Sequence, residues 1–201
     1  MLKRAFDVVV SAAGLIVLSP ISLVIALAIK LDDGGPVLFS QERVGLNGRV
    51  FLAHKFRSMV VDAERDTGAV QATLDDPRVT RVGRVIRATA FDELPQLWNI
   101  LAGDMSVVGP RPLRPGESDT TADGTHIPLS AIRGYEVRHR VRPGLTGLAQ
   151  VYAPRDLPRN GKFRYDLLYQ RRASLCLDLR LVLQSFWITL RGRWEDRDRK
   201  L

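Results

Sequence analysis

Two adjacent carboxylates, Asp92 and Glu93, precede an apolar pattern with helical spacing. Pro95 is tolerated only in the first turn of a helix, so we expect a helix to begin near Asp92. Acidic side chains there often only cap free N–H groups and complement the helix dipole. The same positive end attracts a substrate phosphate and keeps a carboxylate ionised as a nucleophile, and neighbouring carboxylates suit Mg²⁺. Spacing alone favours the capping role and leaves the chemical role open.

Several cations are spaced so that they could meet a phosphate. Lys55 and Arg57 share one face of a predicted strand, residues 50–59, because side chains alternate along a strand. Arg111 stands between two prolines, which restrict the backbone that carries it. For the first pair, spacing alone favours a solvated strand face over a phosphate contact.

A basic stripe is formed by Arg81, Arg84 and Arg87, which recur every third residue. Thr80 is a suitable N-cap for a helix that we expect to run to about Ala88. Such a stripe can lie on lipid headgroups, bind a phosphate or face solvent, and the sequence leaves these three roles open.

The elements that must position these side chains begin with a long apolar run. Residues 8–29 carry no charge and, as a helix, are long enough to cross about 30 Å of hydrocarbon. A cleaved signal peptide is disfavoured, because its apolar region is usually about 7–15 residues long and ends at a small-residue cleavage site.

A proline divides this apolar run. Pro20 follows Ser19 and should kink the helix, because proline removes a backbone hydrogen bond. A kinked membrane span is one possible outcome. Lys3 and Arg4 precede the run and a basic body follows it, so a span would place one positive flank outside. The charge pattern therefore favours a helix that enters the membrane, breaks at Ser19-Pro20 and returns.

Composition limits the remaining choices. The 201 residues are 45% hydrophobic, which is enough for a buried core and excludes a disordered polymer. The single cysteine excludes an internal disulfide and a cysteine zinc cluster, and the three histidines lack metal-ligand spacing. The net charge of +8 indicates an anionic partner, which means nucleic acid, lipid headgroups or a phosphorylated substrate.

The rest of the chain predicts a helix-dominated α/β fold with a small β-hairpin. Residues 37–41 and 50–59 predict two strands joined by a glycine turn. Residues 175–194 predict an amphipathic helix that packs on the core, lies at the membrane interface, or does both. We assign residues 1–31 to the membrane helix and residues 32–201 to the body.

These segments, in this order, resemble the bacterial sugar transferase family, the small monotopic phosphoglycosyl transferases. The resemblance extends over nearly the whole chain, and its strength comes from several individually weak motifs that occur colinearly. The matching stretches are Ser19-Pro20 in the apolar run, Lys55-Phe56-Arg57-Ser58-Met59, Asp92-Glu93-Leu94-Pro95-Gln96, residues 103–112 and Arg142-Pro143-Gly144-Leu145-Thr146-Gly147.

The resemblance implies a monotopic enzyme on the cytoplasmic face of the bacterial cytoplasmic (inner) membrane, held by a re-entrant helix broken at Ser19-Pro20. The family moves a sugar-1-phosphate from a UDP-sugar to undecaprenyl phosphate, a polyprenol phosphate, and releases UMP. This reaction is the first membrane step in the assembly of exopolysaccharides and other glycoconjugates. The resemblance implies a class of donor, not one sugar, and no oligomer is predicted.

The resemblance also implies roles in a ping-pong mechanism. Asp92 would attack the β-phosphate of the donor to form an aspartyl phosphosugar, and Glu93 would bind Mg²⁺ or act as a base toward the acceptor. Mg²⁺ and nearby cations would offset the repulsion between anionic substrates and a carboxylate. Asp92 and Glu93 are thus the predicted catalytic and Mg²⁺-binding pair. The predicted phosphate contacts are Lys55, Arg57, Arg87, Arg111 and Arg155.

Arg155 comes from an imperfect match to the family pattern. Many members carry Asn-Gly-Arg-Asn shortly after the segment that ends here at Val151, whereas this chain differs over residues 152–158. Arg155 would fill the place of that motif's arginine with one residue inserted. Asp166 and Tyr169 match a family Asp-x-x-Tyr pattern, which we interpret as structural.

Two other functions compete with this interpretation. A non-enzymatic membrane scaffold of the same fold predicts loss of the acidic pair or of the basic residues, and both are present. A membrane-tethered nucleic-acid binder fits the positive charge but favours aromatic residues among the basic ones. Aromatic residues are only 7% of the chain and fall mostly in apolar stretches, so we predict membrane lipids as partners and no nucleic acid.

Overall fold

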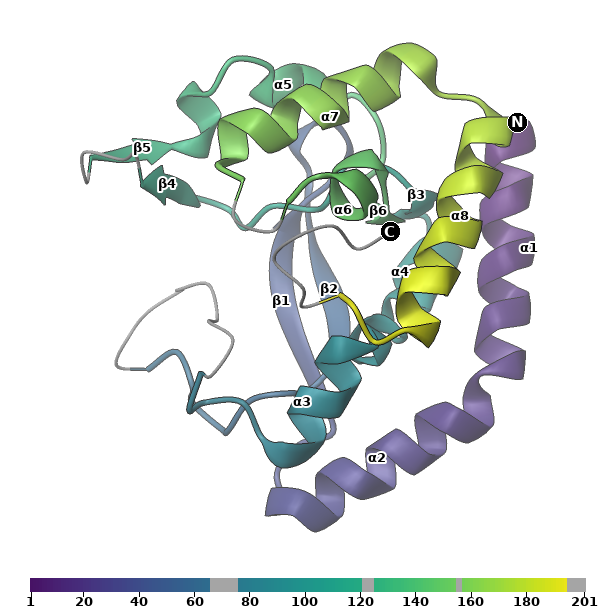
Figure 1. Ribbon diagram of the computed structural model, residues 1–201, viewed down its shortest axis with the longest axis vertical. Helices are drawn as coiled ribbons and strands as arrows, with labels where there is room; N and C mark the ends of the chain where they lie inside the picture. Colours follow the sequence, from purple (N-terminus) through teal and green to yellow (C-terminus); the bar gives the residue numbers. More distant parts are fainter. Residues whose placement is uncertain (66–75, 121–124, 155–156, 195–201) are drawn as a thin grey trace.

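The computed structural model describes residues 1–65, 76–120, 125–154 and 157–194. Helices dominate, and three small two-stranded sheets lie among them (Figure 1), which agrees with the predicted helix-dominated α/β class. The helices are α1 (Leu2–Val17), α2 (Ser19–Asp33), α3 (Arg81–Ala88), α4 (Gln96–Ala102), α5 (Tyr135–Arg138), α6 (Leu148–Tyr152), α7 (Arg159–Arg172) and α8 (Leu175–Leu190). The strands are β1 (Leu38–Val44), β2 (Val50–Phe56), β3 (Ser106–Val108), β4 (Ser118–Thr120), β5 (His126–Pro128) and β6 (Gly144–Thr146).

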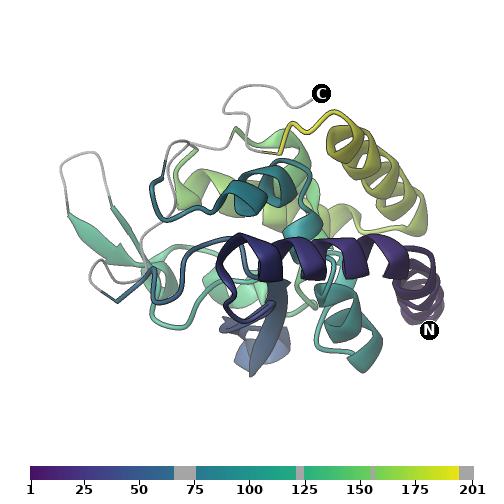
Figure 2. The same ribbon diagram turned by 90° about the horizontal axis from the view of Figure 1, so that it is seen from below.

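The N-terminal apolar run forms two helices that meet at Leu18 with a bend of 58°. Pro20 lies in the first turn of α2, where its missing N–H costs no helical hydrogen bond. The Ser19 hydroxyl donates to the carbonyl of Ile16 (2.8 Å) and so satisfies one group freed at the break. Within the described chain, neither helix alone could cross a membrane, but the bent pair together has the length and composition to do so. Figure 2 shows α2 crossing one end of the molecule, with α1 seen nearly end-on.

Polar side chains of α1 fasten it to the body. Asp7 is 2% exposed, and its Oδ1 accepts hydrogen bonds from the Ser106 hydroxyl (2.9 Å) and the Val107 N–H (3.0 Å) of β3. Arg4 donates to the carbonyls of Ile100 (2.6 Å) and Leu101 (2.8 Å) at the end of α4, which satisfies groups that a helix terminus leaves free. The N-terminal helix pair is therefore bonded to the strand that leads to Arg111.

The predicted hairpin is confirmed, with β1 and β2 antiparallel and Phe39 opposite Lys55. Its turn places Asn47 at φ 53° and Gly48 at φ 79°, in the left-handed region that glycine and asparagine tolerate. The second strand ends at Phe56, earlier than the predicted range of 50–59. Lys55 therefore lies in the strand and Arg57 lies beyond it.

A parallel pair of strands, β3 and β6, lies beside the segment that carries Arg111. A Cβ atom on Gly144 would lie 2.0 Å from the Gly109 nitrogen, and one on Gly109 would lie 2.4 Å from the Arg142 carbonyl oxygen. The two backbones approach closely only because both positions are glycine. This contact fixes the start of the Pro110-Arg111-Pro112 segment.

The predicted helix at Thr80 is confirmed, since the Thr80 hydroxyl accepts from the Gly83 N–H (2.9 Å) and caps α3. The prediction that a helix begins near Asp92 is wrong. A 3₁₀ turn spans Phe91–Glu93, and α4 begins only at Gln96, after Pro95. The cause lies in the backbone on either side: Ala90 takes a left-handed conformation (φ 56°), and Pro95 donates no hydrogen bond.

The predicted amphipathic helix forms as α8. Leu181 and Ile188 are fully buried in the main core, which also contains Ile100, Met105 and Val108. Apolar side chains also project from the other side of this helix and are exposed: Leu179, Leu183, Phe186, Trp187 and Leu190. The helix therefore packs on the core and also presents an apolar surface.

We predict that Asp7→Ala lowers the stability of the fold. The change removes the acceptor for two buried donors, and a buried unpaired N–H costs about 1–3 kcal/mol. For a chain of this size, each kcal/mol lowers the melting temperature by about 2–4 °C. Thermal unfolding of the detergent-solubilised protein checks this, with exposed Glu42→Ala as the control. Equal melting temperatures for the wild type and Asp7→Ala would show that the Asp7 contacts contribute nothing.

Candidate active site

The turn that carries Asp92 and Glu93 is held by apolar packing behind it. Phe91 and Leu94 pack against a cluster that contains Ile25, Phe56 and Ile86. Because these flanking side chains face the cluster, the two carboxylates lie at a cavity of about 1230 Å³. The cavity wall thus combines α2, the end of the hairpin and α3.

Glu93 is bound firmly by two cations. Lys55 Nζ donates to Glu93 Oε1 (2.5 Å), and Arg111 Nη2 donates to the same oxygen (2.9 Å). Only 12% of the Glu93 side chain is exposed. Burial favours the neutral carboxyl, but Arg111 and Lys55 overcome it and hold the pKa of Glu93 well below its usual range. Glu93 is therefore a fixed negative charge that orients both cations.

Asp92 has the opposite environment. Among the described residues it makes no direct hydrogen bond or ion pair, although Lys55 is close enough to act on its charge. Burial raises the pKa of Asp92 to about 6, Lys55 opposes that rise, and the charge of Glu93 adds to it. The result is an ionised carboxylate at neutral pH that is available to a ligand.

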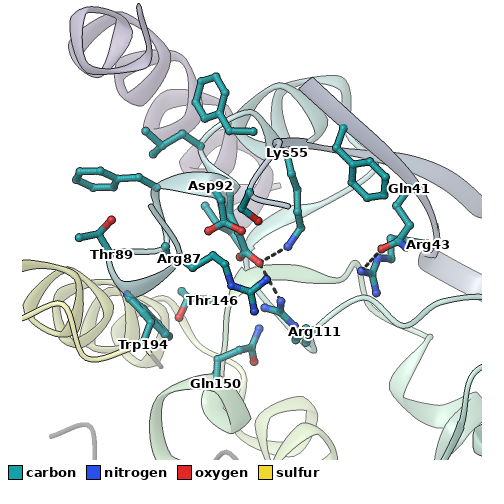
Figure 3. Close-up of a pocket in the computed structure, with 18 of the residues that line it drawn as sticks. Gln41, Arg43, Lys55, Arg87, Thr89, Asp92, Arg111, Thr146, Gln150 and Trp194 are labelled. Carbon is teal, nitrogen blue, oxygen red and sulfur yellow. Dashed lines mark hydrogen bonds and ion pairs between the residues drawn. The ribbon is translucent and has the colours of Figure 1, made fainter. Parts of the chain in front are cut away.

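Three predicted phosphate-binding cations gather around this pair. Figure 3 shows Lys55, Arg87 and Arg111 directed toward the region of Asp92. They come from β2, the last turn of α3 and the proline-flanked segment after β3. The structure therefore assembles these cations from three separate elements, and their contact with phosphate stays a prediction.

Arg57 is placed differently from Lys55. Its side chain is 6% exposed. Its guanidinium donates to both carboxylate oxygens of Asp33 and to the carbonyl of Pro36 (2.6 Å). These bonds join the end of α2 to the end of the hairpin, so we assign Arg57 a structural role in place of the predicted phosphate contact. Arg57 does not share a strand face with Lys55, because the strand stops at Phe56.

The remaining predicted phosphate contact, Arg155, lies outside the described residues.

Sequence reasoning missed the support behind Arg111. Arg138 is 2% exposed, and its Nη2 donates to the carbonyl of Arg111 (2.7 Å) while its Nε donates to Asp166 (3.0 Å). The guanidinium of Arg138 also lies 4.8 Å from the ring centre of Phe163. The Asp-x-x-Tyr pattern that includes Asp166 was the only signal in the sequence for this support. The structure shows that Asp166 holds Arg138, which in turn holds the Arg111 backbone.

The lining of the cavity combines cationic and apolar side chains. Lys55, Arg87 and Arg111 line the part around the carboxylates, while α1 and α8 supply an apolar lining. The α1 helix contributes Val10 and Gly14, and Leu18 lines the cavity at the junction with α2. The α8 helix contributes Val182, Phe186 and Leu190. One site therefore offers a cationic region and an apolar region side by side.

The family description "Bacterial sugar transferase" matches residues 1–192. The chain belongs to the bacterial sugar transferase family. This finding confirms the resemblance inferred from the motifs.

Relatives of this bacterial sugar transferase include a UDP-glucose:undecaprenyl-phosphate glucose-1-phosphate transferase of Klebsiella pneumoniae, 46% identical over 90% of this chain and 38% of the relative. An undecaprenyl-phosphate glucose phosphotransferase of Komagataeibacter xylinus is 46% identical over 90% of this chain and 34% of the relative. The exopolysaccharide production protein PSS of Rhizobium leguminosarum bv. phaseoli is 44% identical over 90% of this chain and 92% of the relative. The chain thus spans little more than a third of the first two relatives and nearly all of the third.

The side chains of this family member fit a magnesium ion only in combination with a ligand. Among the described residues, no group of three or more His, Cys, Asp or Glu side chains is arranged to hold a metal. Mg²⁺ is commonly held by one or two carboxylates, with substrate phosphates and waters completing its shell. Asp92 and Glu93 would supply the carboxylates of such a site, and a diphosphate would supply the rest.

We predict opposite stability effects for the two carboxylates. Asp92 has a raised pKa, so it costs stability as the pH rises from about 4 to about 6, and that cost stays above pH 6. Glu93 has a lowered pKa, so it stabilises the fold above its ordinary pKa, and that contribution is lost as the pH falls through its folded-state value. At pH 8 in a chelator, Asp92→Asn should raise the melting temperature by at least about 2 °C, or about 1 kcal/mol. Glu93→Gln should lower it.

Thermal unfolding at pH 8 and pH 4 checks the direction of the melting-temperature change in each variant. The gain from Asp92→Asn should shrink toward pH 4, because wild-type Asp92 is then protonated. A loss of stability in Asp92→Asn at pH 8, or a gain in Glu93→Gln, would contradict the assigned charge states.

Proposed function

We propose that this protein is a phosphoglycosyl transferase that moves a sugar-1-phosphate from a UDP-sugar to undecaprenyl phosphate and releases UMP. The proposal rests on two adjacent carboxylates that differ in their contacts. Glu93 is held by Lys55 and Arg111, whereas Asp92 has no direct partner among the described residues and lies near the same cations. Family membership and the printed activities of the relatives support the same reaction. It would be the first membrane step of a polysaccharide such as an exopolysaccharide.

The donor belongs to the class of UDP-sugars. Among the relatives, those of Klebsiella pneumoniae, Aeromonas hydrophila and Salmonella typhimurium are named for glucose, N-acetylgalactosamine and galactose, respectively. The identities to this chain, 46%, 42% and 37%, lie too close together to select one sugar.

The proposed chemistry has two balanced steps. An oxygen of the Asp92 carboxylate attacks the β-phosphorus of the UDP-sugar, an O–P bond forms, and the bond to the bridging oxygen breaks so that UMP leaves. A phosphate oxygen of undecaprenyl phosphate then attacks the same phosphorus and displaces Asp92, which leaves a polyprenyl diphosphosugar. A pKa of about 6 suits Asp92 to this role, because the carboxylate is ionised at neutral pH and more basic than an ordinary one.

Glu93 is better suited to act as a fixed negative charge than as a general base. Its pKa lies far below neutrality, so it is a weak base toward the acceptor. Its bonds to Lys55 and Arg111 aim two cations at the place where phosphate charge develops. Mg²⁺ bound by Asp92 and Glu93 would supply further neutralisation of the diphosphate.

We further propose that the protein is monotopic and sits on the cytoplasmic face of the bacterial cytoplasmic membrane. The bent pair α1–α2 would enter and leave on one side, and α8 would lie at the interface. Exposed apolar side chains on all three helices support this placement, including Val9, Ile16, Leu23, Leu27, Leu183 and Phe186. Residues 1–31 would then be the membrane part, and residues 32–201 the catalytic part.

Release of UMP tests the proposed reaction. The solubilised full chain is incubated with Mg²⁺ and a panel of UDP-sugars, with and without undecaprenyl phosphate. One donor should give a burst of at most one UMP per protein without acceptor, and turnover with it. Asp92→Asn should lose at least about a hundredfold in rate, as expected for a nucleophile, while exposed Asp104→Asn should match the wild type. Equal rates in Asp92→Asn would refute the assignment, and no release from folded wild type with any donor would favour a non-enzymatic scaffold.

Pro20→Ala tests the re-entrant topology. Proline at the start of α2 stabilises the break, because it prevents α1 and α2 from joining into one continuous helix. We expect this variant to span the membrane in a measurable fraction of molecules. Cysteine labelling of the two termini in intact cells checks this, with Ser22→Ala in α2 as the control. Labelling that leaves both termini of Pro20→Ala cytoplasmic would contradict the predicted role of the proline.

A further inference from the structure

Arg43 is a charged cavity residue to which the proposed reaction assigns no role. It lies on β1, and its guanidinium donates to the Gln41 side-chain oxygen (2.5 Å) and to the Pro112 carbonyl (3.2 Å). Among the described residues no carboxylate forms an ion pair with it. A partly buried charge with only neutral partners is costly unless a ligand compensates it.

Other guanidiniums crowd the same region. Arg114 also lines the cavity; its Nη2 is bound to Glu64 (2.7 Å), while its buried Nη1 has no hydrogen-bond partner within the described chain. Burial, together with the charges of Arg111 and Arg114, lowers the pKa of Arg43 to about 10. Of these three guanidiniums, Arg111 is paired with Glu93 and Arg114 with Glu64. Among the described residues, Arg43 is therefore the one without an ion-pair partner, and Arg114 keeps one free donor.

The position of Arg43 relative to Asp92 indicates which anion it meets. In Figure 3, Gln41 and Arg43 lie on the far side of Lys55 and Arg111 from Thr89 and Trp194, with Asp92 between the two groups. In phosphoryl transfer the attacking and leaving oxygens are roughly in line with the phosphorus. A phosphorus held between Asp92 and the two cations Lys55 and Arg111 would therefore release its leaving group toward Arg43.

We propose that Arg43 and Arg114 form a second phosphate subsite, which binds the α-phosphate of the nucleoside diphosphosugar and holds it as the nucleotide leaves. This inference rests on the proposed function and adds a binding site to it. The acceptor lipid is a poorer occupant, because α8, which adds apolar side chains to the cavity lining, lies on the Trp194 side of Asp92 in Figure 3. A lipid phosphate that arrives from that side meets Asp92 first.

The test compares UMP with uridine as probes for the solubilised full chain, using titration calorimetry. Arg43→Gln should weaken UMP binding by about tenfold or more, because it removes a charge-assisted hydrogen bond, and should leave uridine binding unchanged. Arg43→Lys should fall between Arg43→Gln and the wild type. Arg49→Gln, which removes an exposed arginine of the same hairpin, should match the wild type. Arg114→Gln should reproduce the loss, and it carries the test if thermal unfolding shows that Arg43→Gln does not fold.

Kinetics separate donor from acceptor. Arg43→Gln should raise KM for the UDP-sugar and leave KM for undecaprenyl phosphate unchanged. Unchanged UMP affinity in Arg43→Gln and Arg114→Gln, an equal loss of uridine binding, or a rise only in the acceptor KM would each overturn the subsite. Wild-type UMP release, measured in parallel, reports on the proposed function independently, since UMP titration requires no sugar and no turnover.

Discussion

Two carboxylates at successive positions repel each other, and the architecture around Asp92 and Glu93 follows from that repulsion. A single oxygen of Glu93 takes hydrogen bonds from both Lys55 and Arg111, so one of the two charges is compensated. The other charge, on Asp92, remains available because the cations are already occupied by its neighbour. Among the described residues, one carboxylate therefore has no direct partner, and the other is fixed by two cations.

This arrangement depends on contacts far from the carboxylates. Arg111 is held at its backbone by Arg138, which is itself held by Asp166 on α7. The start of its segment is fixed by the close glycine contact between β3 and β6. Lys55 reaches the site from the hairpin, whose base is tied to α2 through Arg57 and Asp33. The precision of the site is therefore distributed over the fold.

Sequence reasoning succeeded where local chemistry decides the outcome. The Thr80 cap, the hairpin turn and the break before Pro20 each depend on a few neighbouring residues. It failed where tertiary contacts override a local rule, as at Asp92, where a left-handed Ala90 yields a 3₁₀ turn in place of a helix start. The motifs placed Lys55 and Arg111 at the pair, whereas the tertiary contact of Arg57 with Asp33 was not predicted. The contacts of Arg43 and Arg138 could not be read from local patterns, because their partners are distant in sequence.

The attachment of α1 by Asp7 has a consequence for how such a chain can change length. Asp7 fixes the rotation of α1 about its own axis, and the bend at Leu18 lies roughly 16 Å further along the helix. Inserting or deleting one residue between them would turn the bend by about 100° and point α2 away from α3. The number of residues between Asp7 and Leu18 therefore sets the direction in which α2 leaves α1. This stretch tolerates insertions or deletions only in steps close to a whole helical turn.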